Sequence, residues 1–268
     1  MLSPFRVPSQ RSFSPEQLDQ RLRAGLVGHW IGGGSGNTWF DQSGYGNHGT
    51  LTNGPTWTLG QDGKRNALDF VTASSQYVDC GTAPAVSGLA AISVFAWIWP
   101  VATGSFPMIV GKSDNTNREF LLYHYQASNR LSCELQTPAS TTLNADNYLV
   151  YSQWQHVGFT YDGATMTLWR NGVNLASTAK TGTIRSYPSP LQIGWIGTGA
   201  AYYFGGKIDD VRIFNRGLSA AEIALIASPL FSPVIQPARL SLGAISSGSQ
   251  SLVGNRFRLA GNGGGRAG

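Results

Sequence analysis

The chain alternates between short apolar stretches and turns rich in glycine, proline, asparagine and aspartate. β-Branched and aromatic residues fill most of the apolar stretches, which is typical of strands. Many short strands separated by turns favour a β-sandwich or barrel. The segments predicted to be strands are 26–30, 67–70, 76–79, 92–99, 106–111, 120–125, 130–136, 154–161, 165–170, 173–178, 191–195 and 207–214.

Two features place these strands relative to one another. The segment 92–99 (ISVFAWIW) is apolar on both faces, so we expect it in the middle of the sandwich. The pairs Asp162-Gly163 and Asn171-Gly172 separate consecutive strands by tight turns. These pairs predict two successive β-hairpins within residues 154–178.

Two short helices are expected, one on each side of the strands. Ser14 and Pro15 open the first, as N-cap and first helical residue, and Gly25 stops it. Ser219 stands three residues before Glu222, which is the spacing of a capping box ahead of an apolar run.

The strand before the second helix contains an unusual acidic residue. Strict alternation puts Asp209 on the same face as Val211 and Ile213, whereas Asp210 is expected at the surface. A carboxylate among core side chains is costly unless it has a partner. A bound cation, backbone N–H groups or Arg216 could each provide one.

Composition narrows the class of protein. At 268 residues the chain can hold one large β-domain or two small ones, and 34 glycines and 13 prolines fit a turn-rich fold. No apolar run approaches the roughly 20 residues of a membrane span, so we expect no membrane contact. The N-terminal stretch has no hydrophobic core, so we expect no signal peptide.

Positive charge is concentrated near the two ends. Residues 1–24 and 229–268 contain eight arginines against two acidic residues, a net charge of +6, whereas residues 25–228 contain 11 basic and 12 acidic residues. We therefore divide the chain into an N-terminal arm with a short helix (1–24), one β-domain (25–228) and an extended glycine-rich arm (229–268). Such ends suit an acidic protein surface or a polyanion, although solvated tails have the same composition. The candidate partner-anchoring residues are Arg6, Arg11, Arg256 and Arg258.

Cys80 and Cys133 are the two cysteines of the chain. Each lies in an apolar strand context, so we expect free buried thiols rather than a disulfide. Two cysteines 53 positions apart do not match the spacing of a zinc site.

Four segments occur in a recognisable order. They are GLVGHW with DQSGYGNHGTL, then ISVFAWIWP, WQHVGFTYDGATMTLWRNGV and KIDDVRIFNRGLSAAEI. Over about residues 25–228 they resemble the laminin-G-like, concanavalin A-like family. The resemblance implies an all-β jelly-roll sandwich, most often a non-catalytic module of extracellular, cell-surface or virion proteins. Members often bind glycans or proteins, and many hold a structural calcium ion.

A calcium site is the sharpest hypothesis about a cofactor. Hard cations prefer clustered carboxylate and carbonyl oxygens. The family fold places the first and last strands side by side, so Asp41, Asn47 and Asp209 could converge on one ion. In the alternative reading, Asp41 closes an Asx turn and Asp209 accepts backbone N–H bonds or pairs with Arg216.

A glycan site would need aromatic faces beside polar groups at one rim. The main candidates are Trp195, Tyr202 and Tyr203. Phe204, Trp39 and Tyr45 are further aromatic residues that could contribute, although most aromatic side chains of such a sandwich belong to its core.

Catalysis and nucleic-acid binding have little support. Glu16, Glu119, Glu134 and Glu222 are isolated, and no histidine has a nucleophile motif beside it, so we expect no enzyme. The Arg256-Phe257-Arg258 run is thin evidence for single-strand binding.

A virion would explain an extracellular type of domain without a secretion signal. The leading hypothesis is therefore a phage capsid decoration or fibre-like subunit on the virion surface, whose arms contact other virion proteins or copies of itself while the jelly roll meets glycans. One alternative is a secreted or cell-surface carbohydrate-binding module of a bacterium. Another is an assembly subunit that binds no ligand.

Overall fold

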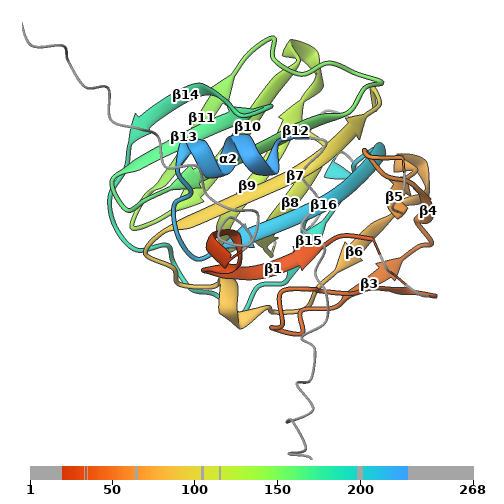
Figure 1. Cartoon of the computed structure of the whole chain (residues 1–268), viewed down its shortest axis with the longest axis horizontal. Coiled ribbons are helices and arrows are strands. Elements are labelled where there is room, and N and C mark those ends of the chain that lie inside the picture. Colours follow the sequence, from red (N-terminus) through yellow and green to blue (C-terminus); the bar gives the residue numbers. More distant parts are fainter. Residues whose placement is uncertain are drawn as a thin grey trace, which may run out of the picture. The chain divides into compact units, whose positions relative to one another are not determined.

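The computed structural model describes residues 20–228, apart from 33, 35, 64–65, 104–105, 115 and 198–201. All of them belong to one compact unit, Met1–Pro233. Two antiparallel eight-stranded sheets pack face to face in this unit (Figure 1). The predicted all-β sandwich is confirmed.

Sheet A has the strand order β14-β13-β12-β7-β16-β5-β4, and β1 pairs with β16 beside this path. The first and last strands of the sandwich are therefore neighbours, as expected, and β7 lies near the centre of the sheet. The strands are β1 (Leu26–Trp30), β4 (Thr56–Leu59), β5 (Asn66–Phe70), β7 (Ile92–Pro100), β12 (Gln155–Tyr161), β13 (Thr165–Arg170), β14 (Val173–Ala179) and β16 (Gly206–Phe214).

Sheet B has the order β11-β10-β9-β8-β15-β6-β3-β2. Its strands are β2 (Thr38–Trp39), β3 (Gly49–Thr52), β6 (Tyr77–Asp79), β8 (Met108–Ser113), β9 (Arg118–Tyr125), β10 (Arg130–Gln136), β11 (Ser140–Ala145) and β15 (Leu191–Ile193). Three short 3-10 helices connect strands: η1 (Thr72–Ser74), η2 (Pro84–Val86) and η3 (Gln126–Ser128).

The main core lies between the two sheets and holds side chains from nearly every strand. The largest of them are fully buried, among them Trp30, Phe120, Phe159 and Tyr161. Both predicted hairpins are present, and Asn171 and Gly172 each have positive φ, at 49° and 79°. This is the backbone that a two-residue hairpin turn requires.

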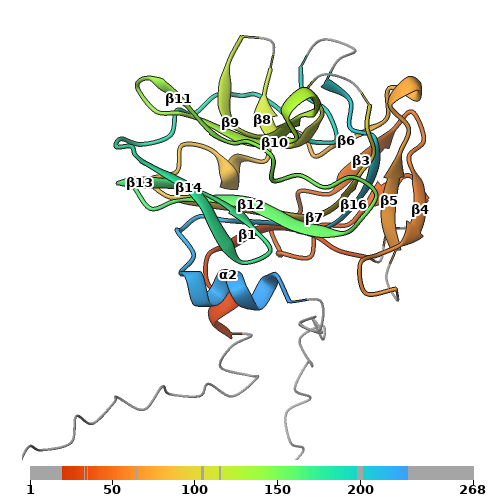
Figure 2. The same cartoon turned by 90° about the horizontal axis from the view of Figure 1, so that it is seen from above.

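A second apolar cluster explains why β7 is apolar on both faces. Helix α2 (Ala220–Ile226) packs Ile223 and Ile226 with Phe95 and Phe214. Because Figure 2 shows α2 lying beneath sheet A, on the side away from sheet B, this cluster covers the outer face of sheet A. The predicted capping box is present, with Ser219 and Glu222 bonded to each other's backbone N–H.

Several elements differ from the expectation. Strands β2, β3, β4 and β11 were not predicted, because they are short, polar or glycine-bearing. The predicted strand 106–111 begins and ends two residues later, as Met108–Ser113. Of the N-terminal helix, residues 20–23 are helical and 14–19 lie outside the described residues. Within the described part of the chain, no helix is long and apolar enough to cross a membrane.

Candidate functional site

The outer face of sheet B carries an apolar cluster of its own. On β9, Phe120 and Leu122 point into the main core, so alternation directs Leu121 and Tyr123 to the opposite face. There Leu121 packs with Met108 and Ile196, and Tyr123 lies against them. In Figure 2 the β8–β9 hairpin projects from the side of the sandwich opposite to α2, so the helix does not cover this face.

The cluster lines one part of a hollow of about 160 Å³. Such a mixture of apolar, aromatic and a few polar side chains is typical of small-molecule sites. The lining residues that matter for its chemistry are Phe106, Arg118, Leu121, Tyr123, Glu134 and Tyr202.

One ion pair supplies the charge in the hollow. Arg118 Nη1 lies 3.2 Å from Glu134 Oε2, and the hydroxyl of Ser140 donates to Glu134 Oε1 at 2.9 Å. The Arg118 side chain is 46% exposed and that of Glu134 is 12% exposed. Burial, with the Glu134 charge as the next cause, raises the pKa of Tyr123, so its hydroxyl is neutral. The hollow therefore offers hydrogen-bonding groups without a net charge.

Aromatic rings line its rim. Phe106 is 40% exposed and stacks on Tyr125, with ring centroids 4.7 Å apart. The ring centroid of Tyr202 lies 6.4 Å from that of Phe106. The Arg130 guanidinium sits over the Tyr125 ring at 5.7 Å and pairs with Asp146, so this cation is also neutralised.

A second aromatic group involves the predicted glycan residues. Trp195 and Tyr203 stack with an interplanar angle of 9° and centroids 5.2 Å apart, and Tyr77 lies 4.8 Å from Trp195. Trp195, Tyr203 and Tyr77 are all half-buried. The three candidates are thus divided between two places: Trp195 and Tyr203 lie in this group, whereas Tyr202 borders the hollow.

Two of the wider aromatic candidates are wrong. Phe204 and Trp39 are fully buried in the core, whereas Tyr45 is 56% exposed. Phe106, Tyr77 and Arg118 were not among the predicted site residues, and Glu134 was not predicted to line a binding site. Alternation in 120–125 could have revealed an apolar outer face on β9, but nothing local in the sequence brings Tyr77 to Trp195.

The proposed calcium ligands meet only in part. The Asp41 carboxylate accepts from the backbone N–H groups of His29, Ser43 and Asn47, each at 2.9 Å. This is the Asx-turn arrangement of the alternative reading, and it keeps Asp41 and Asn47 together. Asp209 instead accepts from the backbone N–H of Gln61 at 3.1 Å. No group of three or more His, Cys, Asp or Glu residues within the described ranges is arranged to hold a metal ion. Calcium binding stays a prediction.

The predicted sheet face of Asp209 and the predicted surface position of Asp210 are wrong because β16 contains a bulge, whereas the backbone N–H partner expected as an alternative for Asp209 is present. The register of β16 shifts between Asp209 and Arg212, and Asp210 has φ of +48°. Ile208, Val211 and Ile213 all belong to the core, so the extra residue puts Asp209 on the other face.

Asp210 is 3% exposed rather than a surface residue. It accepts from both Nε and Nη2 of Arg212 at 2.8 Å and lies 2.8 Å from His29 Nε2. Burial alone would raise the pKa of Asp210, but Arg212 and His29 hold it below its ordinary value. Arg216, the suggested partner of Asp209, pairs with Glu222 instead.

The remaining predictions concern the cysteines and glutamates, most of which the structure describes, and the terminal arginines, which it does not. Cys80 and Cys133 are free and buried, as expected. Glu119, Glu134 and Glu222 have separate partners, namely Lys112, Arg118 and Arg216. The anchoring candidates Arg6, Arg11, Arg256 and Arg258 lie outside the described residues, as does Glu16.

Several solved structures share the fold of this chain. Domain 4 of AbnA, an extracellular GH43 arabinanase from Geobacillus stearothermophilus, aligns with a TM-score of 0.59 and 17% identity, covering 76% of this chain and 99% of that domain. The binding domain of botulinum neurotoxin serotype G aligns with a TM-score of 0.58 and 16% identity, covering 75% of this chain and 50% of that one. The binding domain of Paraclostridial Mosquitocidal Protein 1 gives 0.60 and 15%, covering 79% and 52%. The chain therefore spans about half the length of the two toxin domains.

A comparison with curated proteins gave no match. The family model of the concanavalin A-like lectin/glucanases superfamily matches residues 72–224, which is more than half of the chain. Together with the jelly-roll sandwich, this match shows that the chain belongs to the concanavalin A-like lectin/glucanases superfamily.

Proposed function

We propose that the protein is a carbohydrate-binding module whose ligand lies on the outer face of sheet B. The hollow carries the proposal, because it combines the exposed ring of Phe106 and the half-buried ring of Tyr202 with the Arg118–Glu134 pair. A sugar can place its apolar C–H face against the aromatic rings and direct its hydroxyl groups to the polar side chains, so both the aromatic and the polar lining residues could contact it. The AbnA domain was solved with arabinotriose, and the binding domain of botulinum neurotoxin DC with SialylT, which supports a saccharide ligand.

The charge of the face favours a neutral oligosaccharide. Arg118 is paired with Glu134, and Arg130 with Asp146. An acidic sugar would have to compete with these carboxylates for the guanidinium groups, whereas hydroxyl groups can bond to the pairs as they stand.

Binding without hydrolysis fits the same side chains. Glycosidases use two carboxyl groups roughly 5–9.5 Å apart on either side of the scissile bond. Glu134 is the one acidic side chain among the described residues that line the hollow, and both of its oxygens already have partners. We therefore propose a non-catalytic role.

A panel of neutral and acidic oligosaccharides, measured by calorimetry on the full chain, tests this proposal. Phe106→Ala and Tyr202→Ala should each weaken binding of the best ligand by up to about tenfold, because each removes one ring from the rim. Tyr148→Ala is the matched control, since Tyr148 is 41% exposed and Phe106 is 40% exposed. Equal losses in all three variants, or no saccharide bound at all, would contradict the proposal.

We further propose that the protein is located on a virion, which the arginine-rich segments 1–24 and 229–268 support. The terminal segments would bind other virion proteins, leaving the carbohydrate-binding face outward. Replacing Arg6, Arg11, Arg256 and Arg258 together by alanine should then release the protein from particles without changing saccharide binding. A secreted or cell-surface module would bind saccharides equally well and would not associate with particles. Stable oligomers of the full chain with no saccharide bound would support the assembly subunit instead.

A further inference from the structure

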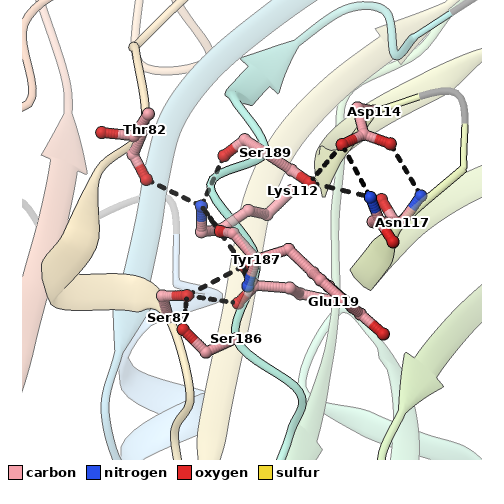
Figure 3. A network of polar contacts seen from close by, with 9 residues as sticks. All are labelled: Thr82, Ser87, Lys112, Asp114, Asn117, Glu119, Ser186, Tyr187 and Ser189. Carbon is pink, nitrogen blue, oxygen red and sulfur yellow. Dashed lines mark hydrogen bonds and ion pairs between the residues drawn. The ribbon is translucent and has the colours of Figure 1, made fainter.

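Lys112 of β8 is buried in a cage of oxygen atoms. Its side chain has no exposed surface, and neither has that of Glu119. The Lys112 ammonium nitrogen lies 2.7 Å from the carbonyl oxygen of Thr82, 2.5 Å from that of Ser189 and 3.5 Å from that of Tyr187. Glu119 Oε1 lies 3.3 Å away (Figure 3). The cage thus consists of three carbonyl oxygens and one carboxylate.

Two residues of the cage, Glu119 and Ser189, are also held by contacts that do not involve the lysine. Ser87 Oγ donates to the Glu119 carboxylate at 2.8 Å, and the backbone N–H of Tyr187 donates to Glu119 Oε1 at 2.9 Å. The hydroxyl of Ser189 donates to Asp114 at 3.0 Å (Figure 3). Four separate stretches of chain meet here: the turn after β6, the strands β8 and β9, and the segment before β15. Glu119 and Ser189 therefore have hydrogen bonds of their own besides those to Lys112.

Carbonyl and carboxylate oxygens converging from several segments are the ligands that proteins use for Ca²⁺, which takes six to eight oxygens at roughly 2.3–2.6 Å. Lysine is rarely buried completely, because its ammonium group usually reaches water at the end of the side chain. We propose that this cage is a calcium-type site that the chain fills with its own ammonium group. Lys112 holds the four segments together in place of a metal ion.

The Lys112 cage and the loop around Asp41 are two separate sites. Asp41 and Asn47 form their own hydrogen-bonded turn near β1, without Lys112 or Glu119. A calcium ion there, if bound, would leave the Lys112 cage unchanged. Removing the ammonium, by contrast, should leave an anionic oxygen cage with room for a hydrated cation.

The test is Lys112→Ala in the full chain, followed by thermal unfolding in chelator and with increasing CaCl₂. The variant should have a low Tm in chelator. It should gain about 5–10 °C, relative to any shift of the parent protein, once calcium exceeds its Kd a hundredfold. Terbium luminescence, measured by titrating Tb³⁺ as a hard-cation probe, should show one more binding site than in the parent protein.

Three further variants test whether the vacated oxygen cage causes the calcium response of Lys112→Ala. Lys112→Met keeps the length of the side chain, so it should lower Tm without creating a calcium response. Adding Glu119→Gln to Lys112→Ala should remove the response, because the cage loses its charge. Lys180→Ala is the matched control: Lys180 is also buried and bonds to the Ala139 carbonyl and the Thr141 hydroxyl, with no carboxylate in either contact.

Two results would overturn the proposal. One is a folded Lys112→Ala protein whose Tm and terbium signal respond to cations no more than the parent protein does. The other is a variant that stays unfolded after refolding both with calcium and with chelator. Either would show that the oxygens do not form a cation site without the lysine.

Discussion

At the residue scale, His124 stands out because its imidazole is buried without a hydrogen-bonding or charged partner among the described residues. His124 of β9 is fully buried against Phe204 and Tyr151, with ring centroids 5.8 and 6.0 Å away. Neither ring nitrogen has a hydrogen-bond partner among the described residues. Burial lowers the pKa of His124 to about 4, from an ordinary value of 6.5. The folded protein therefore holds this imidazole neutral where the unfolded chain would protonate it.

This difference predicts a loss of stability in acid. Between pH 6.5 and 4 the unfolded state binds more protons at His124 than the folded state does, so the free energy of unfolding falls as pH falls through that window. The full effect is about 3 kcal/mol and is complete below pH 4. In urea unfolding at a series of pH values, His124→Phe should remove this share of the pH dependence while keeping an aromatic ring in the core.

His156 is a second buried histidine whose pKa is lowered. It stacks on Phe95 with centroids 5.2 Å apart, and burial lowers its pKa to about 3. Its contribution should persist in His124→Phe, so the variant keeps a smaller acid sensitivity. A variant that loses stability as steeply as the parent protein would contradict the assignment to His124.

At the scale of elements, the outer face of sheet A depends on a helix of seven residues. A helix this short is unstable by itself, so its hydrogen-bonded cap and its contacts with sheet A must hold it. The cap is Ser219 with Glu222, and Arg216 Nη2 lies 2.8 Å from Glu222 Oε1. The contacts are Ile223 and Ile226.

Ser219→Ala should therefore reduce the free energy of unfolding by about 1 kcal/mol, because one backbone N–H of the first turn loses its acceptor. Ser219→Asn should stay close to the parent protein, since asparagine is an equally good N-cap. Urea midpoints of the three proteins provide the measurement. Equal losses in both variants would mean that the cap is not what holds the helix.

At the scale of the whole molecule, the two cysteines report whether the sandwich opens as a unit. Cys80 is 5% exposed and Cys133 is fully buried. Burial raises the pKa of both thiols, with Asp79 and Asp41 adding to the effect at Cys80. Both groups are therefore unreactive thiols in the folded state.

A thiol reagent should thus modify neither cysteine quickly in native protein and both in denaturant. Slow native labelling should follow the global free energy of unfolding as urea is added. Ala179→Cys at the exposed end of β14 is the accessible control and should react at once. Immediate labelling of the parent protein would contradict the burial of the two cysteines. The absence of free thiols in denaturant would contradict their being unpaired.

Local patterns determined much of this protein. The strands β7, β9, β10, β12, β13, β14 and β16, the hairpin at Asn171-Gly172 and the cap at Ser219 follow from alternation, turn residues and side-chain spacing. These signals lie within a few residues of one another, so they can be identified from the sequence alone. The free thiols follow from the same apolar strand contexts.

Other features depended on the tertiary structure. One inserted residue at Asp210 reversed the side-chain direction of Asp209, because alternation has a period of two and a bulge shifts it by one. Phe204 and Tyr202 are two positions apart, yet one is buried and the other lines the hollow. The Lys112 cage joins residues 82, 119 and 189. Burial, exposure and convergence are set by partners that are distant in the chain, and only the packed sheets bring those partners together.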